Sequence, residues 1–465
     1  MNSQQAAPID EWQQQVDPEI GATIYQRGSH RGGDYVRVYV PLSAQQAGTD
    51  LRVIIYLHGF ALCLPSFYAD HLRDLVQQGW IVIFPDFQRS TYREEPLGPA
   101  AAGRPLPLKL SWLKTTRRLI LRAGAEAVMG EDLPEEFASL PLSRLKQRRQ
   151  GLPDLLIRDL RSVLLPWLLI QLILVVIGWF RRTYARNLGQ LIGTVLLSLA
   201  YSPKTWLATA LSISDAAWND LSSRPEYAHW RSQPISCDSF GHSLGGLISL
   251  SLPYQISRLA VQPTLQPKHL LVADPATSTE MGIPWFAIQL LKLFDSPFTA
   301  DPLTIQESGK NLNCPVVILH GMADTLVPPQ LWLDSSGKGG FQAIASDCKA
   351  IYFAESNTKL DPGLVAFHNQ AVTSTQYYDN ALFDSFGGVK NGPNAYNKVW
   401  IWPALTKLFS GATTPDDLLH HLPNRPFQVT TSPIKSRSWF DWLTRDTTQA
   451  AVEPQPDHSS TPPTP

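Results

Sequence analysis

Residues Gly241-His242-Ser243-Leu244-Gly245-Gly246 match the pattern Gly-x-Ser-x-Gly. In this pattern a serine lies on a sharp turn between a strand and a helix, so that its hydroxyl stands clear of the backbone. Small residues two positions away on each side tolerate the strained dihedrals and let neighbouring backbone approach closely. Ordinary glycine-rich turns also match such a short pattern by chance, so the flanking sequence has to decide between the two interpretations.

The flanking sequence favours the strand–turn–helix context that the pattern requires. Residues 234–240 predict a short buried strand, and residues 244–256 predict a helix that is apolar after its glycines. The free N–H groups and the positive dipole end of such a helix would face the serine.

Composition excludes several classes of protein. The chain has 465 residues, long enough for a large core, and length alone favours two or three domains. Its formal net charge of −1 gives no basic signature for nucleic acid, so no nucleic-acid partner is expected. The N-terminus is polar and lacks the basic and apolar regions of a cleavable signal peptide. Four scattered cysteines without C-x-x-C spacing indicate neither a zinc site nor a disulfide framework: Cys63, Cys237, Cys314 and Cys348.

Apolar runs recur along the chain and predict an α/β fold with a mostly parallel central sheet and flanking helices. The first two apolar strands, 52–57 and 80–84, enclose a predicted helix at 65–78 and so form a βαβ unit. Residues 20–25 predict an edge strand, and the alternating residues 35–40 predict a half-buried antiparallel strand. Further buried strands are expected at 269–273, 315–319 and 349–353, the last being the final strand of the sheet.

The pattern divides the chain into segments. A polar lead-in over 1–19 precedes a discontinuous core over 20–100 and 205–440. A helical insertion over 101–204 interrupts that core, and a tail over 441–465, rich in Pro, Ser and Thr, is expected to be disordered.

The insertion is both basic and apolar. Between Arg104 and Arg186 it has 15 Lys and Arg against 7 Asp and Glu, and Val163–Phe180 is a run of 18 residues without a charge. A single membrane crossing would separate two parts of one sheet, so the alternatives are a spanning hairpin, an in-plane interfacial element or a lid packed on the protein's own core. Positive charge on all sides of the apolar runs favours the in-plane element. We therefore expect residues 155–205 to contact a membrane surface, on its cytoplasmic side.

A second segment has the pattern of an anion-stabilising loop. The apolar strand at 52–57 leads directly into His58-Gly59-Phe60. We expect the backbone N–H of Phe60, together with that of Leu244, to form an oxyanion hole. The side chain of His58 is expected to brace this loop, with a catalytic role as the alternative.

The chain resembles the α/β-hydrolase superfamily over residues 20–100 and 205–410. The resemblance rests on His58-Gly59, on Gly-His-Ser243-Leu-Gly-Gly and on the segment 320–328, His-Gly-Met-Ala-Asp-Thr-Leu-Val-Pro, in that order. Within the superfamily, His-Gly-Phe60 and residues 66–68, Ser-Phe-Tyr, are similar to chlorophyllase-type esterases, from which the chain departs in having Leu244 where a basic residue is expected.

The resemblance implies a catalytic triad in the chain order nucleophile, acid, histidine. Ser243 would be the nucleophile, His368 the base and Asp324 the acid that orients the imidazole. Asp274, which follows an earlier strand, is the alternative acid, and His420 and His421 are alternative bases. His242 and His320 are expected to be structural, and the chemistry needs neither a metal nor another cofactor.

These assignments predict a serine hydrolase that cleaves a hydrophobic or lipid ester at a membrane surface. Acyl transfer to an acceptor other than water would use the same residues. The other hypotheses are a soluble hydrolase of small esters or peptides with a helical cap, and a non-catalytic membrane-associated lipid carrier or scaffold. The sequence does not determine the oligomeric state.

Overall fold

The structure is a computed structural model. It describes residues 11–97, 201–281, 296–333, 339–356, 366–374 and 392–421, with gaps at 47, 49, 91, 93 and 325, and the short pieces 194–195, 198, 283, 288–289, 291–292 and 429–430.

One sheet of ten strands runs through the described part of the chain, in the order β1–β2–β3–β5–β4–β6–β7–β8–β9–β10. The strands from β5 to β9 in this order are mutually parallel, β1 to β3 are antiparallel at one edge, and β10 is antiparallel at the other. The strand bounds are β1 Gln13–Asp17, β2 Ala22–Arg27, β3 Val36–Pro41, β4 Leu51–Leu57, β5 Ile81–Pro85, β6 Ile235–His242, β7 Leu270–Ala273, β8 Val316–Gly321, β9 Lys349–Ala354 and β10 Val429–Thr430.

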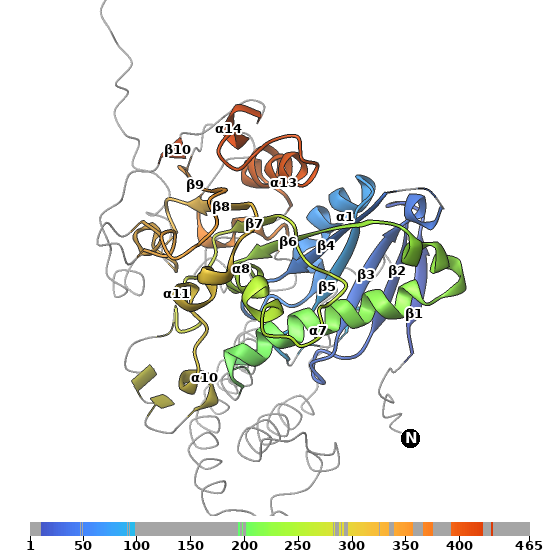
Figure 1. The fold of residues 1–465 in the computed structure, drawn as a ribbon, viewed down its shortest axis with the longest axis horizontal. Coiled ribbons are helices and arrows are strands. Elements are labelled where there is room, and N and C mark those ends of the chain that lie inside the picture. Colours follow the sequence, from blue (N-terminus) through green and yellow to red (C-terminus); the bar gives the residue numbers. More distant parts are fainter. Residues whose placement is uncertain are drawn as a thin grey trace, which may run out of the picture.

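Helices cover both faces of this sheet. Side chains of α1 and α13 pack in the core on one face, and side chains of α7 and α8 pack in the core on the other. In Figure 1, α7 crosses in front of the strands at the N-terminal edge. The helix bounds are α1 Ala69–Gln77, α7 Pro203–Ser222, α8 Leu244–Ile256, α10 Pro297–Ala300, α11 Ile305–Ser308, α13 Trp402–Phe409 and α14 Leu418–His421.

The central strands are apolar because both of their faces are covered. Every residue of β5, β7 and β8 is buried, and β4 is buried apart from the half-buried Arg52. Continuous runs of Val, Ile and Leu are typical of parallel strands between two helical layers. The predicted α/β class, with a mostly parallel central sheet and flanking helices, is therefore confirmed.

The edges of the sheet differ from the prediction. The segment 1–19 is not only a lead-in, because its residues Gln13–Asp17 form β1, whose pairing with β2 makes β2 an interior strand. A polar strand such as β1 is stable at an edge, where most of its side chains face water. β9 is not the last strand either, because β10 pairs with it, and β10 has too few residues to produce an alternating pattern.

The strand β3 also differs, because all six of its residues are buried rather than every second one. It lies between β2 and β5, with helices on both sides of the sheet. Its one cation, Arg37, hydrogen bonds to Gln26 and to the main chain of Glu95, which compensates for its burial.

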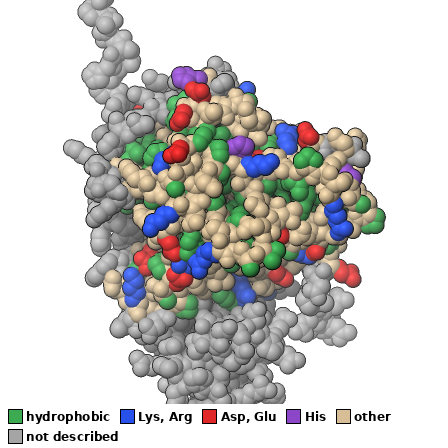
Figure 2. All heavy atoms as spheres, in the orientation of Figure 1, with side chains coloured by type: hydrophobic (Ala, Val, Ile, Leu, Met, Phe, Trp, Pro, Cys, Tyr) green, Lys and Arg blue, Asp and Glu red, His purple; other side chains and the backbone are tan. Residues whose placement is uncertain are grey.

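Most of the insertion over 101–204, with its apolar runs, lies outside the described residues, as does the tail over 441–465. Among the helices that are described, none is both long enough and apolar enough to span a bilayer. On the face drawn in Figure 2, acidic and basic side chains of the described residues are interspersed rather than gathered by sign.

Candidate active site

Ser243 occupies the turn between β6 and α8. Its φ is 56° and its ψ is −119°, a conformation that costs energy for any residue with a side chain. A Cβ at Gly241 would lie 2.2 Å from the carbonyl oxygen of Gly245, and a Cβ at Gly245 would lie 2.3 Å from that of Leu57. Only glycine at these two positions allows the turn to close and the start of α8 to press against the end of β4.

Ser243, His368 and Asp324 form one hydrogen-bonded series. The serine Oγ lies 2.6 Å from Nε2 of the imidazole, and Nδ1 of the imidazole lies 2.7 Å from Oδ2 of the carboxylate. The exposed fractions fall from 8% at Ser243 through 6% at His368 to 3% at Asp324. The serine end of the series is thus the one nearest to solvent.

Backbone N–H groups orient the carboxylate of Asp324. This residue lies in the loop after β8, and its Oδ1 accepts hydrogen bonds of 2.9 Å from the N–H groups of Leu326 and Val327. Those two bonds occupy Oδ1 and leave Oδ2 for the imidazole of His368, which begins a 3₁₀ turn after β9.

The surroundings of His368 raise the pKa of its imidazole. Burial lowers the pKa of His368, but the charge of Asp324, the hydrogen bond to it and the charge of Asp274 outweigh burial, so that the pKa is raised above its ordinary value. An imidazole with this environment accepts a proton more readily than one in water.

Asp274, the alternative acid, directly follows β7, and its carboxylate contacts residues other than His368. Its Oδ1 is 3.0 Å from Nδ1 of His320 and accepts a 2.7 Å hydrogen bond from the N–H of Gly321. Burial raises the pKa of its carboxyl. Of the two aspartates, it is Asp324 that forms the hydrogen bond with His368.

The remaining candidate histidines also have definite positions. His320 donates from Nε2 to the carbonyl of Val327, in the loop that carries Asp324, so it contributes structure there. His420 and His421 lie in α14, and it is His368 that the structure brings to Ser243.

The two predicted oxyanion donors lie in adjoining segments. Leu244 is the first residue of α8, and the first N–H groups of a helix have no partner within it. Within the described ranges, no hydrogen bond is found for the backbone N–H of Leu244 or of Phe60. The close approach of Gly245 to the carbonyls of Leu57 and His58 brings these segments together. Both N–H groups are therefore free to receive an anion, although their role stays a prediction.

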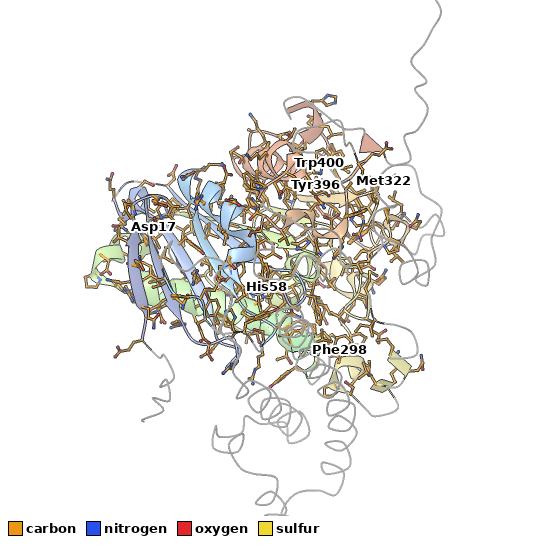
Figure 3. All side chains as sticks on the ribbon, turned by 180° about the vertical axis from the view of Figure 1, so that it is seen from behind. Asp17, His58, Phe298, Met322, Tyr396 and Trp400 are labelled. Carbon is orange, nitrogen blue, oxygen red and sulfur yellow. The ribbon has the colours of Figure 1, made fainter. Side chains whose placement is uncertain are left out.

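His58 lies where the sequence predicted a bracing side chain, near the middle of the molecule in Figure 3. Its Nδ1 donates to the carbonyl of Gly59 at 2.8 Å, and its ring stacks on Phe87 with centroids 4.3 Å apart. Nε2 faces Asp86 at 3.3 Å, and Asp86 also pairs with His30 at 2.7 Å. Although burial raises the pKa of Asp86, its hydrogen bonds to the two histidines lower it to a net value well below the ordinary one.

Two buried clusters bring metal-ligating side chains within 4.8 Å of one another: His30 with Cys63 and Asp86, and Asp274 with His320 and Asp324. Their spacing is that of hydrogen bonds. The shortest nitrogen–oxygen separations are 2.7 Å in the first cluster and 3.0 Å in the second, whereas two such ligands of one tetrahedral zinc lie about 3.3 Å apart. Both clusters are consistent with side chains that share protons rather than a cation.

Sequence analysis predicted no role in the site for two residues that contact the loop after β4. Tyr68 accepts a hydrogen bond from the N–H of Gly59 at 2.9 Å, and Gln88 accepts one from the N–H of Ala61 at the same distance. A tyrosine in a short helix and a glutamine after a strand carry no spacing signal, because their partners are set by how the segments pack.

The strand order, with β5 and β4 exchanged relative to the chain, and the sharp serine turn after β6 together define the architecture. The protein has the α/β-hydrolase fold. No protein-family model matches the chain, and no curated protein matches it in sequence.

Among solved structures, the chain is similar to acetyl xylan esterase 1 from Thermoanaerobacterium sp., with 13% identity over 78% of this chain and 84% of that one, and a TM-score of 0.34. It is also similar to a putative hydrolase from Agrobacterium vitis, with 13% identity, coverage of 78% and 94%, and a TM-score of 0.33. Esterase B from Lactobacillus rhamnosis has 9% identity, coverage of 74% and 79%, and a TM-score of 0.34. At these TM-scores the likeness carries no weight in the fold assignment, which rests on the strand order and the turn.

Proposed function

We propose that the protein is a serine ester hydrolase that acts on a hydrophobic or lipid ester. The observation that carries the proposal is the unbroken series of hydrogen bonds from Ser243 through His368 to Asp324, with distances of 2.6 and 2.7 Å. A hydroxyl, an imidazole and a buried carboxylate in this series are what nucleophilic attack on a carbonyl requires.

In the first step, Oγ of Ser243 attacks the ester carbonyl carbon while its proton passes to Nε2 of His368. The imidazolium is stabilised by Oδ2 of Asp324, and the tetrahedral oxyanion is held by the N–H groups of Phe60 and Leu244. Collapse of the tetrahedral species breaks the bond to the leaving alcohol, which takes the proton from Nε2. The product of this step is an acyl-enzyme.

In the second step, water gives a proton to Nε2 of His368 and attacks the acyl-enzyme. Collapse returns the proton to Oγ of Ser243 and releases the carboxylic acid. An acceptor alcohol in place of water would give a new ester by the same proton transfers, so the hydrolase and acyltransferase hypotheses differ only in the acceptor.

The test is labelling with a fluorophosphonate, which reacts with activated serines. The wild-type protein is expected to be labelled, Ser243→Ala is expected to lose labelling, and Ser257→Ala, an exposed serine just after α8, serves as the matched control. A folded wild-type protein that fails to react, with detergent or membrane present, would exclude the hydrolase and favour the carrier or scaffold hypothesis.

The hydrophobic or lipid substrate rests on the apolar, basic insertion in the sequence. We expect turnover of a series of esters to rise with acyl length, and we expect the protein to sediment with vesicles that contain anionic lipid. Preference for acetate esters together with a protein wholly in the soluble fraction would instead favour the soluble small-ester hydrolase.

A further inference from the structure

A chain of hydrogen bonds joins the loop after β4 to the backbone of His368. The N–H of Gly59 is 2.9 Å from the hydroxyl of Tyr68, that hydroxyl is 3.0 Å from Nδ1 of His242, and Nε2 of His242 is 2.9 Å from the carbonyl oxygen of His368. This series of hydrogen bonds thus begins one residue before Phe60 and ends on the histidine that contacts Ser243.

Only one arrangement of protons satisfies every link. The carbonyl of His368 can only accept, so Nε2 of His242 carries a hydrogen, and in the neutral ring Nδ1 is then an acceptor. The N–H of Gly59 can only donate, so the hydroxyl of Tyr68 accepts from Gly59 and donates to His242. The hydroxyl of Tyr68 thus accepts one hydrogen bond and donates another, and every other polar atom of the series has a single role.

Neighbouring side chains surround this series of hydrogen bonds. Tyr68 and His242 are both fully buried, and the ring of Tyr68 lies edge-on against Tyr56 with centroids 5.3 Å apart. A Cβ at Gly59 would lie 2.9 Å from Nδ1 of His242, so the loop and the imidazole touch. Because both side chains are shielded from bulk solvent, removal of one link leaves buried polar groups unpaired and allows the loop to move.

We propose that Tyr68 and His242 are positioning residues that hold the oxyanion loop and the catalytic base in register as one unit. The inference rests on the proposed function, because it assigns to this unit the distance between the anion-binding N–H of Phe60 and Nε2 of His368. The registry matters only in the transition state, where charge develops on both sides of the carbonyl.

The experiment compares Tyr68→Phe with Tyr56→Phe. The control removes an equally buried hydroxyl that also bonds a histidine, since Tyr56 Oη lies 3.0 Å from Nδ1 of His71, but that pair does not reach His368. We expect Tyr68→Phe to lower kcat by about tenfold to hundredfold with KM changed less than about twofold, and Tyr56→Phe to leave kcat within about threefold of the wild type.

Variants at His242 test whether the unit acts as a whole. His242→Leu is expected to lower kcat as much as Tyr68→Phe does, and the double variant is expected to lose no more than the worse single one, because both break the same chain. His242→Gln retains a donor and an acceptor and is expected to recover at least part of that loss.

Three results would overturn the inference while leaving the serine hydrolase intact: equal losses in Tyr68→Phe and Tyr56→Phe, losses that multiply in the double variant, or an effect confined to KM. A wild-type protein that does not react with fluorophosphonate would instead reject the hydrolase and the positioning role together. The nitrogen shifts of His242, measured by NMR, give a readout independent of turnover: a ring without a hydrogen on Nε2 would contradict the chain.

Discussion

Two buried aspartate–histidine pairs lie at the ends of neighbouring strands. Asp274 follows β7 and lies 3.0 Å from Nδ1 of His320, and Asp324 follows β8 and lies 2.7 Å from Nδ1 of His368. The pairs differ at the far nitrogen of the ring. Nε2 of His320 donates to a main-chain carbonyl, whereas Nε2 of His368 meets the hydroxyl of Ser243.

An aspartate–histidine pair does not by itself make a catalytic site. In one pair both ring nitrogens bond to groups that hold the protein together, and in the other one nitrogen contacts the serine that we propose as the nucleophile. The first pair also influences the second, because the charge of Asp274 is among the causes that raise the pKa of His368.

The largest effect is expected at the imidazoles themselves. His368→Ala removes the base and should lower kcat by about 10⁶-fold, as loss of a triad histidine does. His320→Gln keeps a donor for the loop carbonyl and should lower kcat by less than about 10²-fold. Steady-state kinetics on one ester, with circular dichroism to verify folding, measures both, and equal losses would contradict the difference between the pairs.

The next effect is expected at the acids. Asp324→Asn should lower kcat by about 10⁴-fold because an amide no longer stabilises the imidazolium or selects its tautomer. Asp274→Asn should cost far less, under about 10²-fold, since its side chain contacts His320 rather than the base. A larger loss of kcat in Asp274→Asn than in Asp324→Asn would mean that Asp274, and not Asp324, is the acid.

The pH profile separates charge from contact. The base must be neutral to accept the serine proton, so activity is lost as the pH falls through the pKa of His368. Because that pKa is raised, the acid limb of kcat/KM should have its midpoint above about 6.5. Asp274→Asn removes a negative charge and should shift the midpoint to lower pH, whereas the exposed control Asp220→Asn should not. A midpoint unchanged in Asp274→Asn would show that the charge of Asp274 does not reach the base.

The smallest effect is expected at Tyr396, whose hydroxyl lies 3.4 Å from Oδ1 of Asp274. Tyr396 is labelled in Figure 3. Because this hydrogen bond is long, Tyr396→Phe should reduce the free energy of unfolding by about 0.5–1.5 kcal/mol and leave kcat within about threefold. Urea denaturation followed by tryptophan fluorescence measures the free energy of unfolding. A loss of kcat larger than that of Asp274→Asn would contradict the expected order of the two variants.

Much of the core could be predicted because its signals are local. The bounds of α8 agree with the prediction, and β4, β5, β7, β8 and β9 differ from it by one or two residues at their ends. Apolar runs enclosed by turn residues are unambiguous when a strand is buried on both faces. The polar edge strand β1 and the two-residue strand β10 had no such run, and only their pairing with β2 and β9 makes them strands.

The available chemistry follows from the sequence alone: a serine in a glycine-flanked turn, aspartates after later strands and histidines beyond them, in the chain order nucleophile, acid, histidine. Tertiary structure alone decided which of two aspartates reaches the base, because Asp274 and Asp324 follow similar apolar strands and differ only in what their loops pack against. It also decided that Tyr68 meets His242, 174 residues away in the chain. Such pairs leave no periodicity, because they depend on how segments pack in space rather than on the spacing of residues along the chain.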